Sequence, residues 1–458
     1  MPNILTAALA TALIATAPSA AQTVPPREAT PHDRAIAAGY KALMICGALN
    51  AARVAGGTRS VASVEANELR GTYPEYDALL PTLKAEVGDA GIQVAYDREM
   101  PPRIAAYNFF RGCTLQPIGT LKAVVRGPMV RLTPPSPPGG WPSGAPANVA
   151  APRGALAPVV AAAFDGRYGA GTNTLSVMVL DNLGTIVGER YAEGFTPATP
   201  NRTWSVAKSM AGTIVGAAVH RGLIDPQAPA LVPEWQEEGD PRRTITIDHL
   251  LRMASGLHSS TAGNRTDAVY FGGTAVTEET VGWPLLHPPG SRFRYANNDT
   301  LLAMRALRAK IGHDLFADDL LFSRIGMRST IAEQDWQGNY ILSSQVWSTP
   351  RDFARLGLLW LNDGVWQGKR LLPEGWMRYM TTPSGPQPAS GPGYGATLWL
   401  FGADQGLPAG SYAAQGNRGQ YIMVIPSRRI VVVRRGEDPA GARFDIAKFA
   451  GDVLKAMP

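Results

Sequence analysis

The chain has 458 residues, of which 45% are hydrophobic and 17% are charged, and its formal net charge at pH 7 is +6. These proportions are those of a globular protein, and the length allows two folded units. The basic residues are scattered, apart from Arg428-Arg429 and Arg434-Arg435, which bracket a short apolar run typical of a strand. This distribution argues against nucleic-acid binding.

The chain begins with an apolar and small-residue stretch over residues 4–17. Ser19 and Ala21 supply the small side chains of a cleavage site after Ala21, which predicts a signal peptide over residues 1–21 and a secreted or periplasmic protein. No Lys or Arg precedes the stretch, unlike most such signals. No later segment reaches about 18 apolar residues, so we expect no stable membrane insertion.

The two cysteines, Cys46 and Cys113, both lie in the first third of the chain. An oxidising compartment would permit a disulfide between them. Two separately buried thiols fit the sequence equally well, because spacing does not show proximity. No cysteine lies in the region that carries the serine motif described below, so thiol catalysis is not expected.

Residues 22–126 form an N-terminal extension in which no catalytic motif is visible. Apolar spacing predicts helices over residues 33–54 and 62–69, and strands over residues 91–96 and 121–125. Residues 127–153 contain eight prolines. Because proline interrupts both helices and central strands, residues 127–154 are predicted to be a linker or an extended strap.

Residues 155–458 show a regular succession of strands and helices. A short helix over 156–164 precedes two strands, 175–180 and 185–191, that a turn connects. Helices follow from residue 205 to near residue 222 and over 351–361, and the chain ends with strands over 397–401, 421–425 and 430–434 and a helix over 444–457. This order predicts one antiparallel sheet with helices packed on it, an α+β fold.

Ser205 and Lys208 are one helical turn apart, so their side chains share a face of the predicted helix. An adjacent base is what a weak serine nucleophile needs. Tyr295 and Asn297 follow in a Tyr-Ala-Asn motif. Alone, each has a simpler explanation: Ser205 as a helix cap, Lys208 as a solvated side chain, Tyr295 as a core residue and Asn297 as a turn residue.

Five ordered motifs support the catalytic interpretation. They are Trp-Ser-Val-Ala-Lys-Ser at 204–209, Leu-Leu-Arg-Met-Ala-Ser-Gly-Leu at 250–257, Pro-Gly-Ser-Arg-Phe-Arg-Tyr-Ala-Asn-Asn at 289–298, Arg-Asp-Phe-Ala-Arg-Leu-Gly at 351–357 and Gly-Asn-Arg-Gly-Gln at 416–420. Over residues 155–458 the chain resembles the serine β-lactamase-like hydrolases of the class C and penicillin-binding-protein type, nearest to the 6-aminohexanoate-dimer hydrolases and esterases. The resemblance implies a β-lactamase-like sheet flanked by helices, with an all-helical subregion, and an N-terminal α/β extension outside it.

The resemblance also implies a role for each motif residue. Ser205 would attack the substrate carbonyl from a helix N-terminus, and Lys208 would take the serine proton. Tyr295 would relay a proton to the leaving group. Asn297 would orient Lys208 or a substrate amide. Ser209 and Asn298, the asparagine that follows Asn297, are assigned to packing or turns.

The third motif departs from the family pattern. Related lactamases and peptidases carry Lys-Thr-Gly or His-x-Gly beside the serine, where this chain has Ala-Gln-Gly ending at Gly416. The resemblance implies an oxyanion hole made by the backbone N–H groups of Ser205 and Asn417. Without the cation, efficient β-lactamase activity is not expected. Arg418 could restore the charge if it points into the site; the alternative is that it points into solvent.

Other chemistries are disfavoured by the sequence. The six histidines show no metal-ligand spacing, no Gly-x-Ser-x-Gly elbow surrounds a serine, and no phosphate-binding loop is visible. We therefore expect no metal and no cofactor. The leading hypothesis is an exported serine hydrolase that cleaves a small-molecule or short oligomeric amide or ester through a Ser205 acyl-enzyme. The alternatives are a D,D-peptidase or β-lactamase, and a non-catalytic ligand-binding or sensor protein. The oligomeric state is not indicated.

Overall fold

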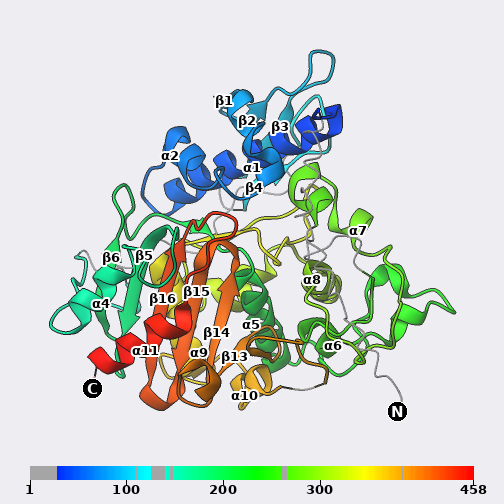
Figure 1. Ribbon diagram of the computed structural model, residues 1–458. Coiled ribbons are helices and arrows are strands. Elements are labelled where there is room, and N and C mark those ends of the chain that lie inside the picture. Colours follow the sequence, from blue (N-terminus) through cyan, green and yellow to red (C-terminus); the bar gives the residue numbers. More distant parts are fainter. Residues whose placement is uncertain are drawn as a thin grey trace, which may run out of the picture.

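The computed structural model describes residues 28–108, 111–124, 140–144, 148–258, 266–383 and 385–457 (Figure 1). The predicted signal peptide and most of the proline-rich stretch lie outside these residues. The predicted division into residues 22–126, 127–154 and 155–458 stays a prediction.

A seven-stranded antiparallel sheet forms the centre of the molecule (Figure 1). Its strand order is β12-β13-β14-β15-β16-β5-β6. The bounds are β5 Thr174–Leu180, β6 Ile186–Tyr191, β12 Gly393–Tyr394, β13 Trp399–Phe401, β14 Ser411–Gly416, β15 Gln420–Ile425 and β16 Ile430–Gly436. Five of these strands match the predicted ones, and the α+β plan is confirmed.

Helices cover both faces of this sheet because its strands alternate apolar side chains between the two faces. Val431 and Val433 of β16 pack in the cluster that contains α5 (Val206–His220) and α9 (Pro350–Leu361). Ile430 and Val432 pack in the cluster that contains α4 (Leu156–Ala162) and α11 (Ile446–Ala456). The helices predicted at these four places are confirmed.

A mainly helical subregion lies beside the sheet, toward the right in Figure 1. It contains the elements α6 Ile247–Leu251, η5 Ala268–Gly272, α7 Val276–Glu279, α8 Asn297–Ile311 and η6 Asp318–Phe322. A small sheet of order β7-β9-β8 joins distant segments, with β7 Asn201–Arg202, β8 Ile331–Ala332 and β9 Val346–Ser348. A hairpin, β10 Val365–Trp366 with β11 Lys369–Arg370, precedes α10 Trp376–Thr381.

The N-terminal region packs α1 (Pro31–Val54) on a separate antiparallel sheet of order β1-β2-β3-β4. Thr30 caps α1, since its hydroxyl accepts a hydrogen bond from the backbone N–H of Asp33. The remaining elements are α2 Val61–Ala66, α3 Pro74–Asp77, η1 Leu80–Thr82, β1 Ala85–Gly88, β2 Gly91–Val94, β3 Arg103–Asn108 and β4 Gly112–Leu115. Both predicted helices and the predicted strand at 91–96 are confirmed.

The strand predicted over residues 121–125 is wrong for its described part. Residues 121–124 form no strand, and the side chains of Leu121 and Val124 are 86% and 59% exposed. An apolar run forms a strand only where a neighbouring strand pairs with its backbone hydrogen-bonding groups. The strands β1, β3 and β4 were not predicted from the sequence. They are six residues long or shorter, and no clear alternation of apolar residues marks them.

Among the described residues, α1 alone is long and apolar enough to cross a membrane by length and composition. Its most apolar window is 94% buried within the protein. Such burial is typical of a core helix.

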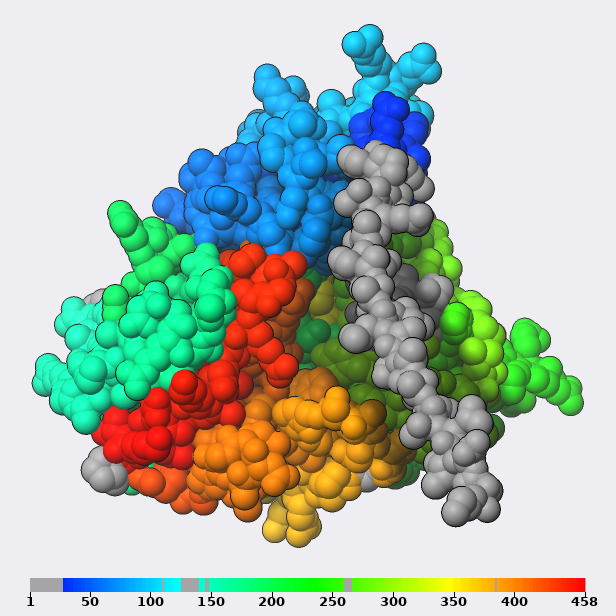
Figure 2. Space-filling model, in the orientation of Figure 1, coloured from blue at the N-terminus to red at the C-terminus, as the bar shows by residue number. Residues whose placement is uncertain are grey.

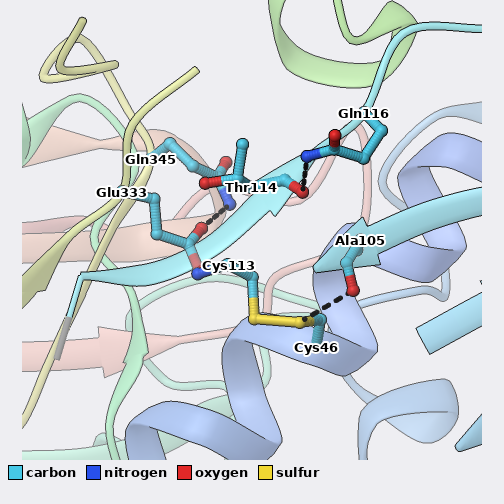
Figure 3. Close-up of a disulfide and its surroundings, with 7 residues drawn as sticks. All are labelled: Cys46, Ala105, Cys113, Thr114, Gln116, Glu333 and Gln345. Carbon is cyan, nitrogen blue, oxygen red and sulfur yellow. Dashed lines mark hydrogen bonds between the residues drawn. A yellow bond between two sulfur atoms is a disulfide. The ribbon is translucent and has the colours of Figure 1, made fainter. Parts of the chain in front are cut away.

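A disulfide between Cys46 of α1 and Cys113 of β4 links the helix to its sheet (Figure 3). The two Cα atoms are 5.9 Å apart. The backbone N–H of Cys113 also donates to Glu333 Oε1 over 2.8 Å, and Gln345 Nε2 donates to Glu333 Oε2 over 2.7 Å. Of the two possibilities left open by the sequence, the structure contains the bridge.

The N-terminal region shares its hydrophobic core with the rest of the chain. One buried cluster combines α1 and its sheet with Trp204, Phe271 and Trp347. Gly47 of α1 lies directly against the Trp347 ring, where a Cβ atom would overlap. In Figure 2 the blue N-terminal atoms rest on the red atoms of the C-terminal segment. This region therefore forms part of the surface around the serine motif.

Candidate active site

A pocket of about 520 Å³ opens above the N-terminus of α5. Three parts of the chain line it: the N-terminal region, the segments around the serine and tyrosine motifs, and the end of β14. The lining residues are Thr72, Tyr73, Pro74, Glu75, Trp204, Ser205, Tyr270, Tyr295, Asn297, Ser344, Trp399, Gln415, Gly416 and Asn417.

Ser205 stands at the entrance to α5 and is partly exposed to this pocket. Trp204, the residue before it, has a left-handed backbone with φ of 49°, a conformation that costs energy in a residue other than glycine. Lys208 lies one turn further along α5 and is 1% exposed. Its Nζ is 3.0 Å from Ser205 Oγ.

Two further oxygen atoms contact the Lys208 amine. Nζ is 2.6 Å from Asn297 Oδ1 and 2.9 Å from the carbonyl oxygen of Ser343. Both atoms can only accept hydrogen bonds. A neutral amine has two N–H groups and one lone pair, so donation to these two acceptors directs the lone pair toward the Ser205 hydroxyl. The arrangement is suited to removing the serine proton.

The electrostatics favour that neutral form. Burial lowers the pKa of Lys208 from 10.5 to about 7, and the nearby Arg202 cation acts in the same direction. Arg202 is 1% exposed, its guanidinium lies 3.8 Å from the Trp204 ring centroid, and it donates to Ser344 Oγ over 2.8 Å. Because Arg202 already carries a positive charge here, a positive charge on Lys208 is unfavourable.

Tyr295 faces the same pair. Its hydroxyl shares a hydrogen bond with Ser205, and Lys208 Nζ is 5.0 Å from its ring centroid. Burial raises the pKa of Tyr295, an effect that the hydrogen bond with Ser205 partly offsets. The phenol is therefore protonated at neutral pH and can donate a proton. Asn297, the first residue of α8, is held beside it.

Gly416 brings the end of β14 against the serine. A Cβ atom at this position would lie 2.5 Å from the Thr203 carbonyl oxygen and 3.1 Å from the Ser205 backbone nitrogen. The approach is too close for any side chain. Asn417 begins the turn that follows and lines the pocket. The structure thus places this turn next to the Ser205 N–H.

Arg418 requires a correction. It points neither into the pocket nor into solvent: it is 6% exposed, and its guanidinium is directed into the contact with the N-terminal region. Its Nε also lies 3.0 Å from Oε2 of Glu437, the residue that follows β16. Arg418 does not line the pocket. Among the lining residues that the structure describes, none carries a positive charge.

Several residues of the site were not found from the sequence. Ser343 contributes a backbone carbonyl, which any residue type could supply, so its sequence carried no signal. Tyr270, whose hydroxyl is 2.6 Å from Ser343 Oγ, and Arg202 lie in segments without a motif. Ser209 is buried and donates to the Thr397 carbonyl, in agreement with its assignment to packing. Within the described ranges, no three His, Cys, Asp or Glu side chains are grouped to hold a metal ion.

Comparison with known proteins assigns the chain to a family. A family model described as Beta-lactamase matches residues 160–445. The 6-aminohexanoate-dimer hydrolase of Paenarthrobacter ureafaciens is 26% identical over 281 residues, which are 56% of this chain and 70% of that protein.

Two solved structures share the fold. A family VIII carboxylesterase superposes with a TM-score of 0.54 at 15% identity, over 66% of this chain and 97% of the esterase. A Bacillus anthracis protein named as a candidate 6-aminohexanoate-dimer hydrolase superposes with a TM-score of 0.53 at 22% identity, over 62% of this chain and 78% of that protein. Since the family model covers more than half of its residues, this chain belongs to the Beta-lactamase family.

Proposed function

We propose that this protein is a serine hydrolase that cleaves an ester or a linear amide through an acyl-enzyme on Ser205. The observation that carries the proposal is the 3.0 Å contact between Ser205 Oγ and a Lys208 amine whose other two partners are acceptors only. A buried amine with its pKa near 7 is a base of suitable strength at neutral pH.

In the first step the neutral Lys208 takes the Ser205 proton while Oγ bonds to the substrate carbonyl carbon. The carbonyl oxygen becomes an oxyanion, and the backbone N–H groups of Ser205 and Asn417 donate to it. The N-terminal end of α5 adds a favourable dipole at the same place.

Collapse of this intermediate breaks the bond to the leaving group. Tyr295 gives its proton to the departing nitrogen or oxygen, and the Lys208 ammonium restores the Tyr295 proton. Water then attacks the acyl carbon, a proton passes back through the same groups to Ser205, and the acid is released. Lys208 and Tyr295 thus act as base and acid in turn.

The charge of the pocket supports a neutral ester or amide over a β-lactam of the penicillin type, whose carboxylate a cation usually binds. Carboxylate-bearing substrates are best held by a cationic side chain, above all by arginine. Among the described lining residues the only charged side chain is that of Glu75, and Arg418 is directed elsewhere. The similarity to a 6-aminohexanoate-dimer hydrolase is a separate reason to propose cleavage of an amide.

Export is part of the proposal. Two observations support it: the apolar stretch over residues 4–17 and the disulfide between Cys46 and Cys113. Structural disulfides are typical of secreted and periplasmic proteins. Localisation of the full-length chain, followed by sequencing of the mature N-terminus, tests this point; a product that retains residues 1–21 would contradict it.

The activity is tested by hydrolysis of nitrophenyl butyrate, nitrocefin and the linear 6-aminohexanoate dimer. We expect the wild type to cleave the ester or the dimer and to spare nitrocefin, and Ser205→Ala to be inactive. Preferential cleavage of nitrocefin would favour a lactamase or peptidase instead. Equal rates for the wild type and Ser205→Ala would contradict the assignment of Ser205.

A further inference from the structure

One wall of the active-site pocket comes from outside the family match. Residues 72–75, here called the N-terminal wall, line the pocket although the family model begins at residue 160. Thr72 and Tyr73 are buried, whereas Pro74 and Glu75 are exposed. The catalytic residues of the family motifs therefore share their pocket with a segment that those motifs do not specify.

Arg418 holds this wall in place. Its guanidinium donates to the Thr72 hydroxyl and to four backbone carbonyls, those of Glu68 over 3.1 Å, Arg70 over 2.8 Å, Glu437 over 3.1 Å and Asp438 over 3.1 Å. Hydrogen bonds to a charged donor are stronger than neutral ones. The three contacts with residues 68–72 fix the segment that leads into the wall.

The same arginine also belongs to the turn that carries Asn417. Arg418 has a left-handed backbone with φ of 57°, which directs its side chain away from the pocket while Asn417 stays on the pocket side. A residue other than glycine adopts this conformation at some cost. The Arg418 side chain thereby connects the turn that contains Asn417 to the N-terminal wall.

A second anchor attaches the wall next to the nucleophile. The Tyr73 ring packs edge-on against Phe271 and Tyr40, with centroids 5.0 and 5.2 Å away, and lies 6.3 Å from the ring of Trp204. Trp204 directly precedes Ser205. Aromatic pairs in this geometry stabilise a packed position. The wall is a fixed part of the pocket.

Building on the proposed hydrolase function, we propose that the N-terminal wall limits the length of the acyl group that the site accepts, and that Arg418 is the positioning residue that holds the wall. The family motifs supply the chemistry, and the N-terminal region supplies the specificity. Substrates with short acyl chains fit beneath the wall, while longer chains collide with it.

The test compares the kcat/KM of nitrophenyl acetate and nitrophenyl octanoate for the wild type, Arg418→Met and the double variant Pro74→Ala/Glu75→Ala. The double variant removes bulk only from exposed wall residues, so its fold is kept. Arg428→Met, at an exposed arginine away from the wall, is the matched control. We expect the octanoate-to-acetate ratio to rise about tenfold or more in both test variants and to stay unchanged in the control.

A purely structural role of Arg418 would lower both rates by the same factor and leave their ratio unchanged. An unchanged ratio in the double variant overturns the wall as the length limit. A raised ratio there with an unchanged ratio in Arg418→Met overturns the positioning role of Arg418. If the wild type cleaves neither ester and a fluorophosphonate does not label it, the hydrolase function itself fails, and the proposal fails with it.

Discussion

Lys208 Nζ donates to Asn297 Oδ1 over 2.6 Å, although 89 residues separate the two in the sequence. The amide of Asn297 therefore occupies one N–H of the amine without adding charge. A carboxylate at the same place would stabilise the ammonium form instead. The amide thus favours a Lys208 that can act as a base.

Asn297→Asp is expected to shift the pH dependence of activity upward. In the wild type, kcat/KM should rise with pH through about 7, as Lys208 loses its proton. The new carboxylate raises the pKa of Lys208, so the rise moves to higher pH and activity at neutral pH falls by about tenfold or more. Asn297→Ala, which adds no charge, is the control. An identical pH profile in Asn297→Asp would contradict the role of Lys208 as the base.

Lys208→Met is expected to abolish activity and to change the pH dependence of stability. The folded-state pKa of Lys208 is lowered from 10.5 to about 7, so between these values the unfolded wild type binds more protons than the folded one. Wild-type stability from this group therefore rises with pH across that window, by on the order of 1 kcal/mol per pH unit.

The variant lacks this contribution. Its free energy of unfolding minus that of the wild type should decrease steadily as the pH rises from 7 to 10.5. Denaturant titrations at several pH values measure the difference. A constant difference across the window would show that Lys208 titrates as an ordinary solvated lysine.

Gly416→Ala should impair catalysis because the added methyl group meets the Thr203 carbonyl and the Ser205 N–H. A displacement of about 1 Å at a reacting centre can cost roughly a hundredfold in rate. Gly402→Ala is the matched control, since a Cβ atom there has nothing within 4 Å and its backbone is extended. Steady-state kinetics and circular dichroism of both variants measure the effect. Full activity in Gly416→Ala would contradict the close approach.

Removal of the disulfide should destabilise the protein, since Cys46 and Cys113 close a loop with a sequence separation of 67. The double variant Cys46→Ala/Cys113→Ala is expected to lose about 2 to 4 kcal/mol of unfolding free energy. Unfolding in denaturant, with and without reductant, measures the loss. The reductant should lower the unfolding free energy of the wild type and leave that of the double variant unchanged. An unfolding free energy of the wild type that does not change with reductant would argue against the bridge.

The sequence predicted the central part of the fold because its signals are local. The continuous apolar runs of β15 and β16 and the spacing of Ser205 and Lys208 depend on neighbours a few residues away. The family motifs brought Tyr295, Asn297, Gly416 and Asn417 to the same pocket, as expected.

The direction of the Arg418 side chain could not be predicted. Its partner Thr72 is 346 residues earlier in the chain, and hydrogen bonds to distant backbone carbonyls leave no pattern in the sequence. The same holds for the Ser343 carbonyl. The pairing of Cys46 with Cys113 also depended on how α1 packs on β4, which spacing alone does not specify.

Covalent labelling tests most directly whether Ser205 is the nucleophile. The protein is incubated with a fluorophosphonate, and intact mass spectrometry and peptide mapping locate the adduct. We predict one adduct on Ser205 in the wild type and none in Ser205→Ala. The control is Ser209→Ala, which removes a neighbouring buried serine whose hydroxyl donates a hydrogen bond to the Thr397 carbonyl. This control should still carry the adduct on Ser205. Equal labelling of Ser205→Ala, or no labelling of a wild type that hydrolyses its substrate, would contradict the assignment.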